Sequence, residues 1–118
     1  MKDCSAMSGF EINLAVAHID LGKGNYDWSA EKKEVYRAGM DGGEFLPNAY
    51  FDPCNNPADA WSIILENGIG LRKQSNGLWC ATMMGGMNPQ YDKNPLRAAM
   101  IVFLMIKAQE AENAKTSE

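Results

Sequence analysis

Hydrophobic residues return at helical intervals in three stretches of the chain, and the first stretch follows a recognisable helix start. Ser8 is followed three residues later by Glu11, which is the spacing of a capping box. The apolar positions that then recur at helical spacing are Ile12, Ala15, Val16 and Ile19. Because Gly22 can end a helix, the pattern predicts a helix between Ser8 and Gly22.

An Asn-Pro pair opens the second predicted helix. Asn56 can accept hydrogen bonds from the free amides of the first turn, and Pro57 fits the first helical position, where an N–H is not needed. Asp59 places negative charge at the positive end of the helix dipole. The predicted apolar stripe consists of Ala58, Trp61, Ile64 and Leu65. Asn67 and Gly68 end this helix.

The third predicted helix repeats the Asn-Pro start, with Asn94 as its cap and Pro95 as its first residue. It is expected to run to about Ala111. Residues 98–106 are all apolar, so this part of the helix has no polar face. Such a helix is buried on all sides, either as the central helix of the core or in a contact between chains. Because a domain of this size encloses a helix with difficulty, we predict a homo-oligomer.

A β-hairpin is predicted between the second and third helices. Residues 69–74 and 78–84 flank Asn76-Gly77, a strong signal for a tight turn. In the segment 24–51, Val35-Tyr36 and Phe45-Leu46 suggest two short strands on either side of residues 40–44.

These elements predict an α+β fold. It is expected to be a single small domain over residues 1–112, with three helices and a short antiparallel sheet that includes the hairpin at about 69–84. Residues 113–118 are predicted to be a polar tail that frays.

Composition and charge narrow the classes of function. The chain has 118 residues, of which 46% are hydrophobic and 22% charged, enough apolar content for one packed domain. Its 11 basic and 15 acidic residues give a net charge of -4. Duplex nucleic acid is therefore an unexpected partner, since binding it depends on Lys and Arg, whereas one small anionic ligand remains possible. The N-terminus lacks the apolar stretch of a signal peptide and no apolar run is long enough for a membrane, so we expect a cytoplasmic protein.

The reactive residue types form no catalytic or metal-binding pattern. Cys4, Cys54 and Cys80 are widely spaced and odd in number, which favours free thiols. No cofactor and no metal are expected. His18 is the one histidine and is predicted to be a partly buried packing residue of the first helix. No hydrolase elbow, zinc-protease, phosphate-loop or calcium-loop spacing occurs, so an enzyme is not expected.

The two Asn-Pro helix starts are the best candidates for a ligand site, because a helix N-terminus offers free amides and partial positive charge to an anion. Arg97 lies in the first turn of the third helix, where a cation needs a partner. That partner could be a phosphate of a ligand. The more ordinary alternatives are a carboxylate, either Asp59 or one on a partner chain, or solvent around an unpaired side chain. Trp61 and Trp79 are expected in the core, with stacking on a flat ligand as the alternative. The candidate ligand-binding residues are Asn55, Asn56, Asp59, Trp61, Trp79, Asn94 and Arg97.

Two of these segments resemble a known family. Residues 54–67, CNNPADAWSIILEN, resemble the central motif of the NinX-like family of lambdoid-phage accessory proteins, and residues 94–105, NPLRAAMIVFLM, are similar to its C-terminal motif. Phe10-Glu11-Ile12-Asn13, with the following Val16-Ala17, resembles the start of the family. Ser62 stands where the family usually has Pro, and residues 24–51 match loosely. The resemblance implies a phage or prophage protein that acts in the bacterial cytoplasm, and it implies no biochemical activity.

Two functional hypotheses follow. The first is an oligomeric, non-enzymatic binder of a small anionic ligand, such as a cyclic nucleotide or cyclic ADP-ribose immune signal. Small phage proteins of this kind include sponges that trap such signals, and the present layout is similar by analogy to the Thoeris-inhibiting sponges. The alternative is a protein–protein interaction module in which the third helix and the tail engage a host or phage protein.

Overall fold

A computed structural model of the chain describes residues 6–37 and 50–116. The helices are α1 (Gly9–Asp20), α2 (Pro57–Asn67) and α3 (Pro95–Thr116), with a short 3-10 turn η2 (Met84–Gly86). The strands are β1 (Tyr26–Ser29), β2 (Glu34–Arg37), β3 (Gly70–Lys73), β4 (Trp79–Thr82) and β5 (Gln90–Asp92). The predicted α+β fold is confirmed, and each predicted helix start is observed.

The strands form two small antiparallel sheets. β1 pairs with β2, so the strand predicted at Val35-Tyr36 exists, whereas the one predicted at Phe45-Leu46 lies outside the described residues. The predicted hairpin is confirmed as β3 and β4, and β5 adds a third strand beside β4. β5 has three residues, too few for an alternating pattern to predict a strand. Its pairing with β4 is what makes it a strand.

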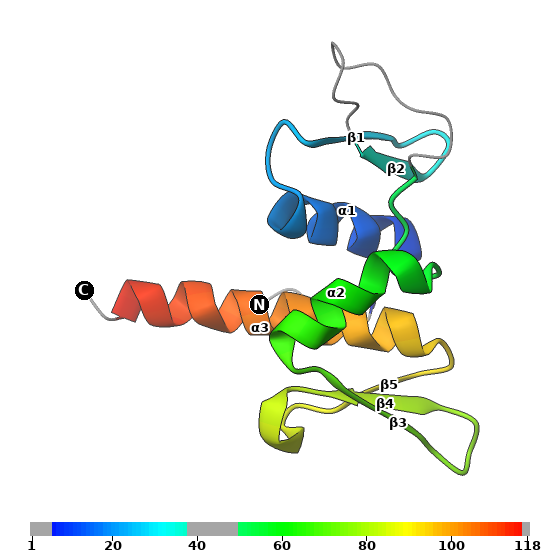
Figure 1. The fold of residues 1–118 in the computed structure, drawn as a ribbon, viewed down its shortest axis with the longest axis vertical. Coiled ribbons are helices and arrows are strands. Elements are labelled where there is room, and N and C mark those ends of the chain that lie inside the picture. The colour runs from blue at the N-terminus through cyan, green and yellow to red at the C-terminus, as the bar shows by residue number, and fades with distance from the viewer. Residues whose placement is uncertain (1–5, 38–49, 117–118) are drawn as a thin grey trace.

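Helix α3 is the centre of the fold. Figure 1 shows α1 and the β1–β2 sheet on one side of α3 and the three-stranded sheet on the other, with α2 crossing it. Residues 98–104 are all buried by these neighbours within one chain. Of the two interpretations of the apolar run, the central core helix is therefore correct. The homo-oligomer stays a prediction, but this run no longer requires it.

The apolar stripe predicted for α2 is wrong at three of its four positions, because Ala58, Trp61 and Leu65 are exposed and Ile64 alone of the four is buried. Trp61 and Leu65 are each 60% exposed, so the expectation that Trp61 lies in the core is also wrong. The buried positions of the helix are Asp59, Ala60, Ile63 and Ile64. Helix α2 has apolar residues on two faces, and its sequence pattern cannot tell which face meets α3.

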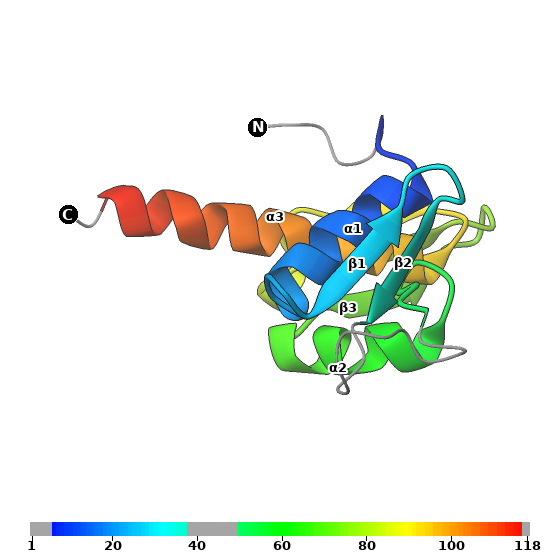
Figure 2. The same cartoon turned by 90° about the horizontal axis from the view of Figure 1, so that it is seen from above.

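Helix α3 is longer than predicted. It continues past Ala111 to Thr116, and its C-terminal half extends away from the rest of the fold in both views (Figures 1 and 2). Residues 107–116 contain several good helix formers and neither Gly nor Pro, so nothing local stops the helix. In the part of the chain that the structure describes, no helix has the length and apolarity to cross a membrane.

Candidate functional site

The loop that precedes α2 is held by its own backbone and by the helix that follows. The amides of Asn55 and Asn56 both donate to the carbonyl oxygen of Asp52, at 3.0 and 2.7 Å. The Asp52 amide donates to Oδ2 of Asp59, 3.0 Å away. Asp59 is buried and also pairs with Arg37, its Oδ1 lying 3.0 Å from the guanidinium. The buried carboxylate thus joins the loop, α2 and β2.

Asn13 attaches this loop to α1. Its Nδ2 donates to Oδ1 of Asp52 at 2.7 Å, and its Oδ1 accepts the amide of Cys54 at 3.1 Å. The residue is 7% exposed, and these bonds satisfy both ends of its amide group. Nothing in the local sequence marked Asn13 as a polar residue on the buried face of α1.

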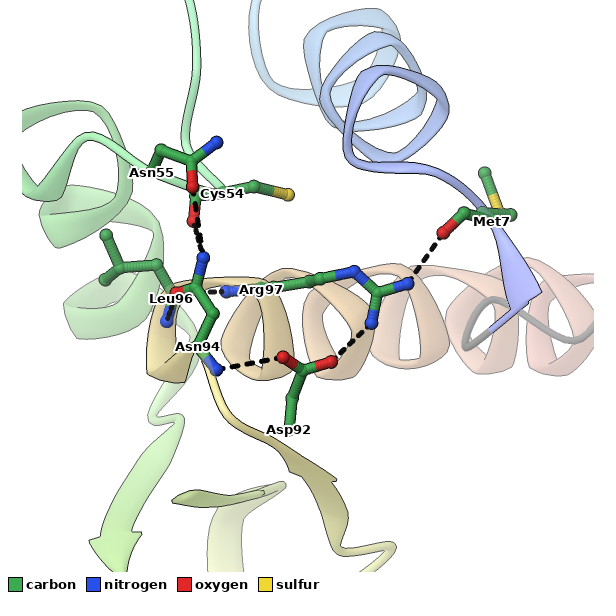
Figure 3. A network of polar contacts seen from close by, with 7 residues as sticks. All are labelled: Met7, Cys54, Asn55, Asp92, Asn94, Leu96 and Arg97. Carbon is green, nitrogen blue, oxygen red and sulfur yellow. Dashed lines mark hydrogen bonds and ion pairs between the residues drawn. The ribbon is translucent and has the colours of Figure 1, made fainter. Parts of the chain in front are cut away.

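Asn94 brings the two Asn-Pro helix starts together. Its Nδ2 donates to the Cys54 carbonyl at 2.6 Å and to Oδ1 of Asn55 at 3.2 Å (Figure 3). Its Oδ1 caps α3 by accepting the amides of Leu96 and Arg97. Asn56 likewise caps α2 by accepting the amide of Ala58 at 3.0 Å. The amides that the anion-site hypothesis reserved for a ligand therefore already have acceptors.

Arg97 lies in an ion pair within the chain, the more ordinary of the interpretations considered. Its Nη1 is 2.5 Å from Oδ2 of Asp92, and its Nη2 donates to the Met7 carbonyl at 2.6 Å (Figure 3). The carboxylate partner is Asp92 at the end of β5 and not Asp59, which pairs with Arg37. Only 22% of the Arg97 side chain is exposed, so it ties the start of α3 to the segment before α1.

The two tryptophans of the predicted site lie elsewhere. Trp61 is on the outer face of α2, and Trp79, at the start of β4, is partly buried. Neither of them lines the cleft described next, where Asn55 and Asn56 are found.

A cleft of about 370 Å³ lies between α1, β2 and the loop before α2. Its volume is near the lower end of the roughly 300–1,000 Å³ found for small-molecule sites. Asn55 and Asn56 line it together with Phe10, Lys33 and Tyr50, which the sequence interpretation missed. These residues come from three separate segments, so only the tertiary structure brings them together.

Lys33 stands on the wall of the cleft in a strained backbone conformation. Its φ is 57°, in the left-handed region that favours Gly and Asn. A non-glycine residue held there costs on the order of 1 kcal/mol or more, and such residues gather at functional sites. The chain thus retains an ammonium group at a position where glycine would be the easier choice.

The cleft presents mixed charge and free donors. Lys33 lines it together with Glu34 and Asp52, which bring two carboxylates. Gly9 and Phe10, the first residues of α1, lie at its edge. The first amides of a helix have no acceptor within it, and the Ser8 cap takes only that of Glu11. The arrangement suits a ligand with one anionic group and a polar part that donates hydrogen bonds.

Cysteine and histidine chemistry contributes little here. Cys54 and Cys80 are free and buried, whereas Cys4 lies outside the described residues. Among the residues that the structure describes, no three His, Cys, Asp or Glu side chains are grouped closely enough to hold a metal ion. His18 is exposed, which corrects the prediction of a partly buried residue, and its Nδ1 is 3.0 Å from the Tyr26 hydroxyl.

Burial, and secondarily the Asp52 carboxylate, raises the pKa of Cys54 from 9.0 to about 12. The unfolded chain loses this proton above about pH 9 while the folded chain keeps it, so stability from this group is complete below pH 9 and declines as the pH rises toward 12. Cys54→Ala should lose some packing but escape this decline. The difference in free energy of unfolding between wild type and variant should therefore shrink between about pH 9 and 11 in urea titrations. A difference that stays constant across this range would contradict the raised pKa.

The described residues form a small α+β domain in which two sheets and two further helices pack around α3. A cleft lies beside the starts of α2 and α3, which Asn94 connects. A family model described as Bacteriophage P22, NinX matches residues 3–107. Because this match covers most of the 118 residues, the chain belongs to the bacteriophage P22 NinX family, and the resemblance found in the sequence is confirmed. No curated protein and no solved structure matches the chain significantly.

Proposed function

We propose that this phage-family protein is a non-enzymatic binder of a small anionic ligand, acting in the cytoplasm of the bacterial host. The observation that carries the proposal is strained Lys33 on the wall of a cleft of about 370 Å³. The proposal therefore places the ligand in this cleft, and no longer at the neighbouring starts of α2 and α3 as the sequence hypothesis did. Asn55 and Asn56 belong to both. Asp59 and Asn94 support the loop that forms one wall, whereas Arg97 bonds to Asp92 and Met7 outside that loop.

The chemistry of the lining favours a nucleotide with a single base, such as a cyclic ADP-ribose isomer. Lys33 and the free amides at Gly9 and Phe10 suit a phosphate oxygen. Tyr50 is half exposed and offers an aromatic face to a base. The carboxylates of Glu34 and Asp52 can accept from amino or hydroxyl groups, and they disfavour a ligand with many negative charges.

Lys33→Gly separates binding from folding. Glycine adopts the left-handed conformation without strain, so the free energy of unfolding should stay unchanged or rise by up to about 1 kcal/mol. Loss of one charge-assisted contact, worth roughly 1.5–3 kcal/mol, should weaken nucleotide binding about tenfold or more. The measurement is calorimetric titration of both proteins with cyclic ADP-ribose isomers and cyclic di- and trinucleotides, beside thermal unfolding without ligand.

Lys32→Gln is the matched control, because it removes the same charge from the same turn at a residue that does not line the cleft. It should bind as wild type does. Lys33→Asn, which tolerates the backbone conformation without a charge, should behave like Lys33→Gly. If wild type binds no member of the panel at tens of micromolar, the nucleotide proposal fails.

A protein–protein interaction module is the second candidate, and exposed Trp61 and Leu65 on α2 favour it. The core half of α3 is buried, so this helix can meet a partner only through its projecting C-terminal half. Native mass spectrometry of protein from infected cells would report a retained ligand, a retained partner and the proposed homo-oligomer in one measurement.

A further inference from the structure

A second groove, of about 430 Å³, lies between the end of α2, the turn at η2 and the projecting half of α3. Its apolar lining comes from Met83, Met84, Met87 and Ile106. Met84 and Met87 are 75% and 64% exposed, although large apolar side chains usually avoid water. Methionine is flexible and polarisable, which suits a surface that packs against another protein.

The methionine turn is held in place by its own bonds. The Met83 amide donates to the Met87 carbonyl at 2.8 Å, and the Gly86 amide donates to the Met83 carbonyl at 2.9 Å. Asn88 Nδ2 lies 3.2 Å from the Met83 sulfur. Met84 extends over Gly68, where a Cβ would come within 2.9 Å of its methyl carbon. The two exposed methionines are therefore presented by an ordered turn against the end of α2.

The rim of this groove is acidic. Glu66 and Glu110 line it, and neither Lys nor Arg is among its lining residues. Asp20 lies outside this groove and lines a neighbouring pocket with Glu66 and Lys107. Lys107 also pairs with Glu110 at 3.2 Å, on an exposed part of α3. The two carboxylates that line the groove thus meet one close ammonium group, that of Lys107, which leaves the rim negative.

We propose that this groove docks a cationic amphipathic helix of another protein, whose apolar side chains pack on Met84 and Met87 while its Lys or Arg side chains face Glu66 and Glu110. A helix that lies in a groove by its apolar face is a common mode of peptide recognition. The apolar lining provides the packing contact, and the acidic rim favours a partner with positive charge. This surface is separate from the ligand cleft, so either site can exist without the other.

The test uses the full chain with carbon-13 methyl-labelled methionine and a synthetic helix of leucine and lysine, about 18 residues or five turns long. A saturable shift of the Met84 and Met87 methyl signals is expected, while those of Met7 and Met100, which lie outside the groove, stay in place. Two further peptides are titrated in parallel. One has the same composition in an order without an apolar face, and the other replaces lysine by glutamate.

Two pairs of variants locate the site. Met84→Ser combined with Met87→Ser should weaken binding about tenfold or more, whereas Trp61→Ser, which removes an exposed apolar residue outside the groove, should not. Glu66→Lys should weaken binding several-fold, and Glu31→Lys, the same charge change in the β1–β2 turn, should not. Unchanged melting temperatures show that all the variants remain folded.

Each other outcome overturns the proposal. Equal binding of the reordered lysine peptide means attraction by charge alone, and equal binding of the glutamate peptide removes the role of the acidic rim. Met84 and Met87 signals that move on dilution of the protein alone identify a second copy of this chain as the occupant. No saturable shift up to about 1 mM peptide, the limit of weak specific binding, removes the docking site.

Discussion

Asn13→Ala is expected to lower the free energy of unfolding by about 3 kcal/mol, because it leaves two partners of Asn13 without their hydrogen bonds. The Cys54 amide loses a buried bond of 3.1 Å and the Asp52 carboxylate loses one of 2.7 Å. Leaving a buried polar group unsatisfied costs roughly 1–3 kcal/mol, more when it is charged. The loss is measured by urea unfolding at neutral pH.

Gln109→Ala is the control for this prediction, since Gln109 also carries a side-chain amide and is exposed on the projecting half of α3. Its effect should stay within about 0.5 kcal/mol, as for most surface changes. Asn13→Ala should also weaken ligand binding in the cleft, because Asn13 and Asp52 both line it. A variant as stable as wild type would mean that the loop before α2 does not depend on Asn13.

Arg97→Ala is expected to lower the free energy of unfolding by about 2 kcal/mol, twice the limit for an exposed ion pair. The Asp92 carboxylate is only 20% exposed and loses its cationic partner, and the Met7 carbonyl loses a donor at 2.6 Å. Arg97→Lys should restore only part of the loss, because one ammonium group cannot reproduce both directions of the guanidinium. Chemical unfolding of the two variants measures both effects.

Lys107→Ala provides the comparison, because its pair with Glu110 is exposed and should contribute at most about 0.5 kcal/mol. The unfolding and binding of Arg97→Ala also distinguish a structural role of Arg97 from a role in ligand binding. A structural arginine lowers the melting temperature in the absence of ligand. If Arg97→Ala instead keeps its melting temperature and loses nucleotide binding, Arg97 belongs to the ligand site and the cleft proposal needs to be extended toward α3.

The sequence by itself determined the three helix starts and the hairpin. The Ser8–Glu11 capping box, the Asn56 and Asn94 caps and the Asn76-Gly77 turn are all observed where they were predicted. Each of these signals acts over two to four residues, through bonds between a side chain and the nearest amides, so it is present in the local sequence.

Only the tertiary structure decided which face of α2 is buried, which carboxylate Arg97 meets and where a ligand could bind. Asn13 and Asp52 are 39 residues apart, and Met7 and Arg97 are 90 apart. No local periodicity relates such positions, because their contacts depend on how the helices and sheets pack around α3. The same packing covers residues 98–104 within one chain, so an apolar run that suggested an oligomer is the core of a single domain.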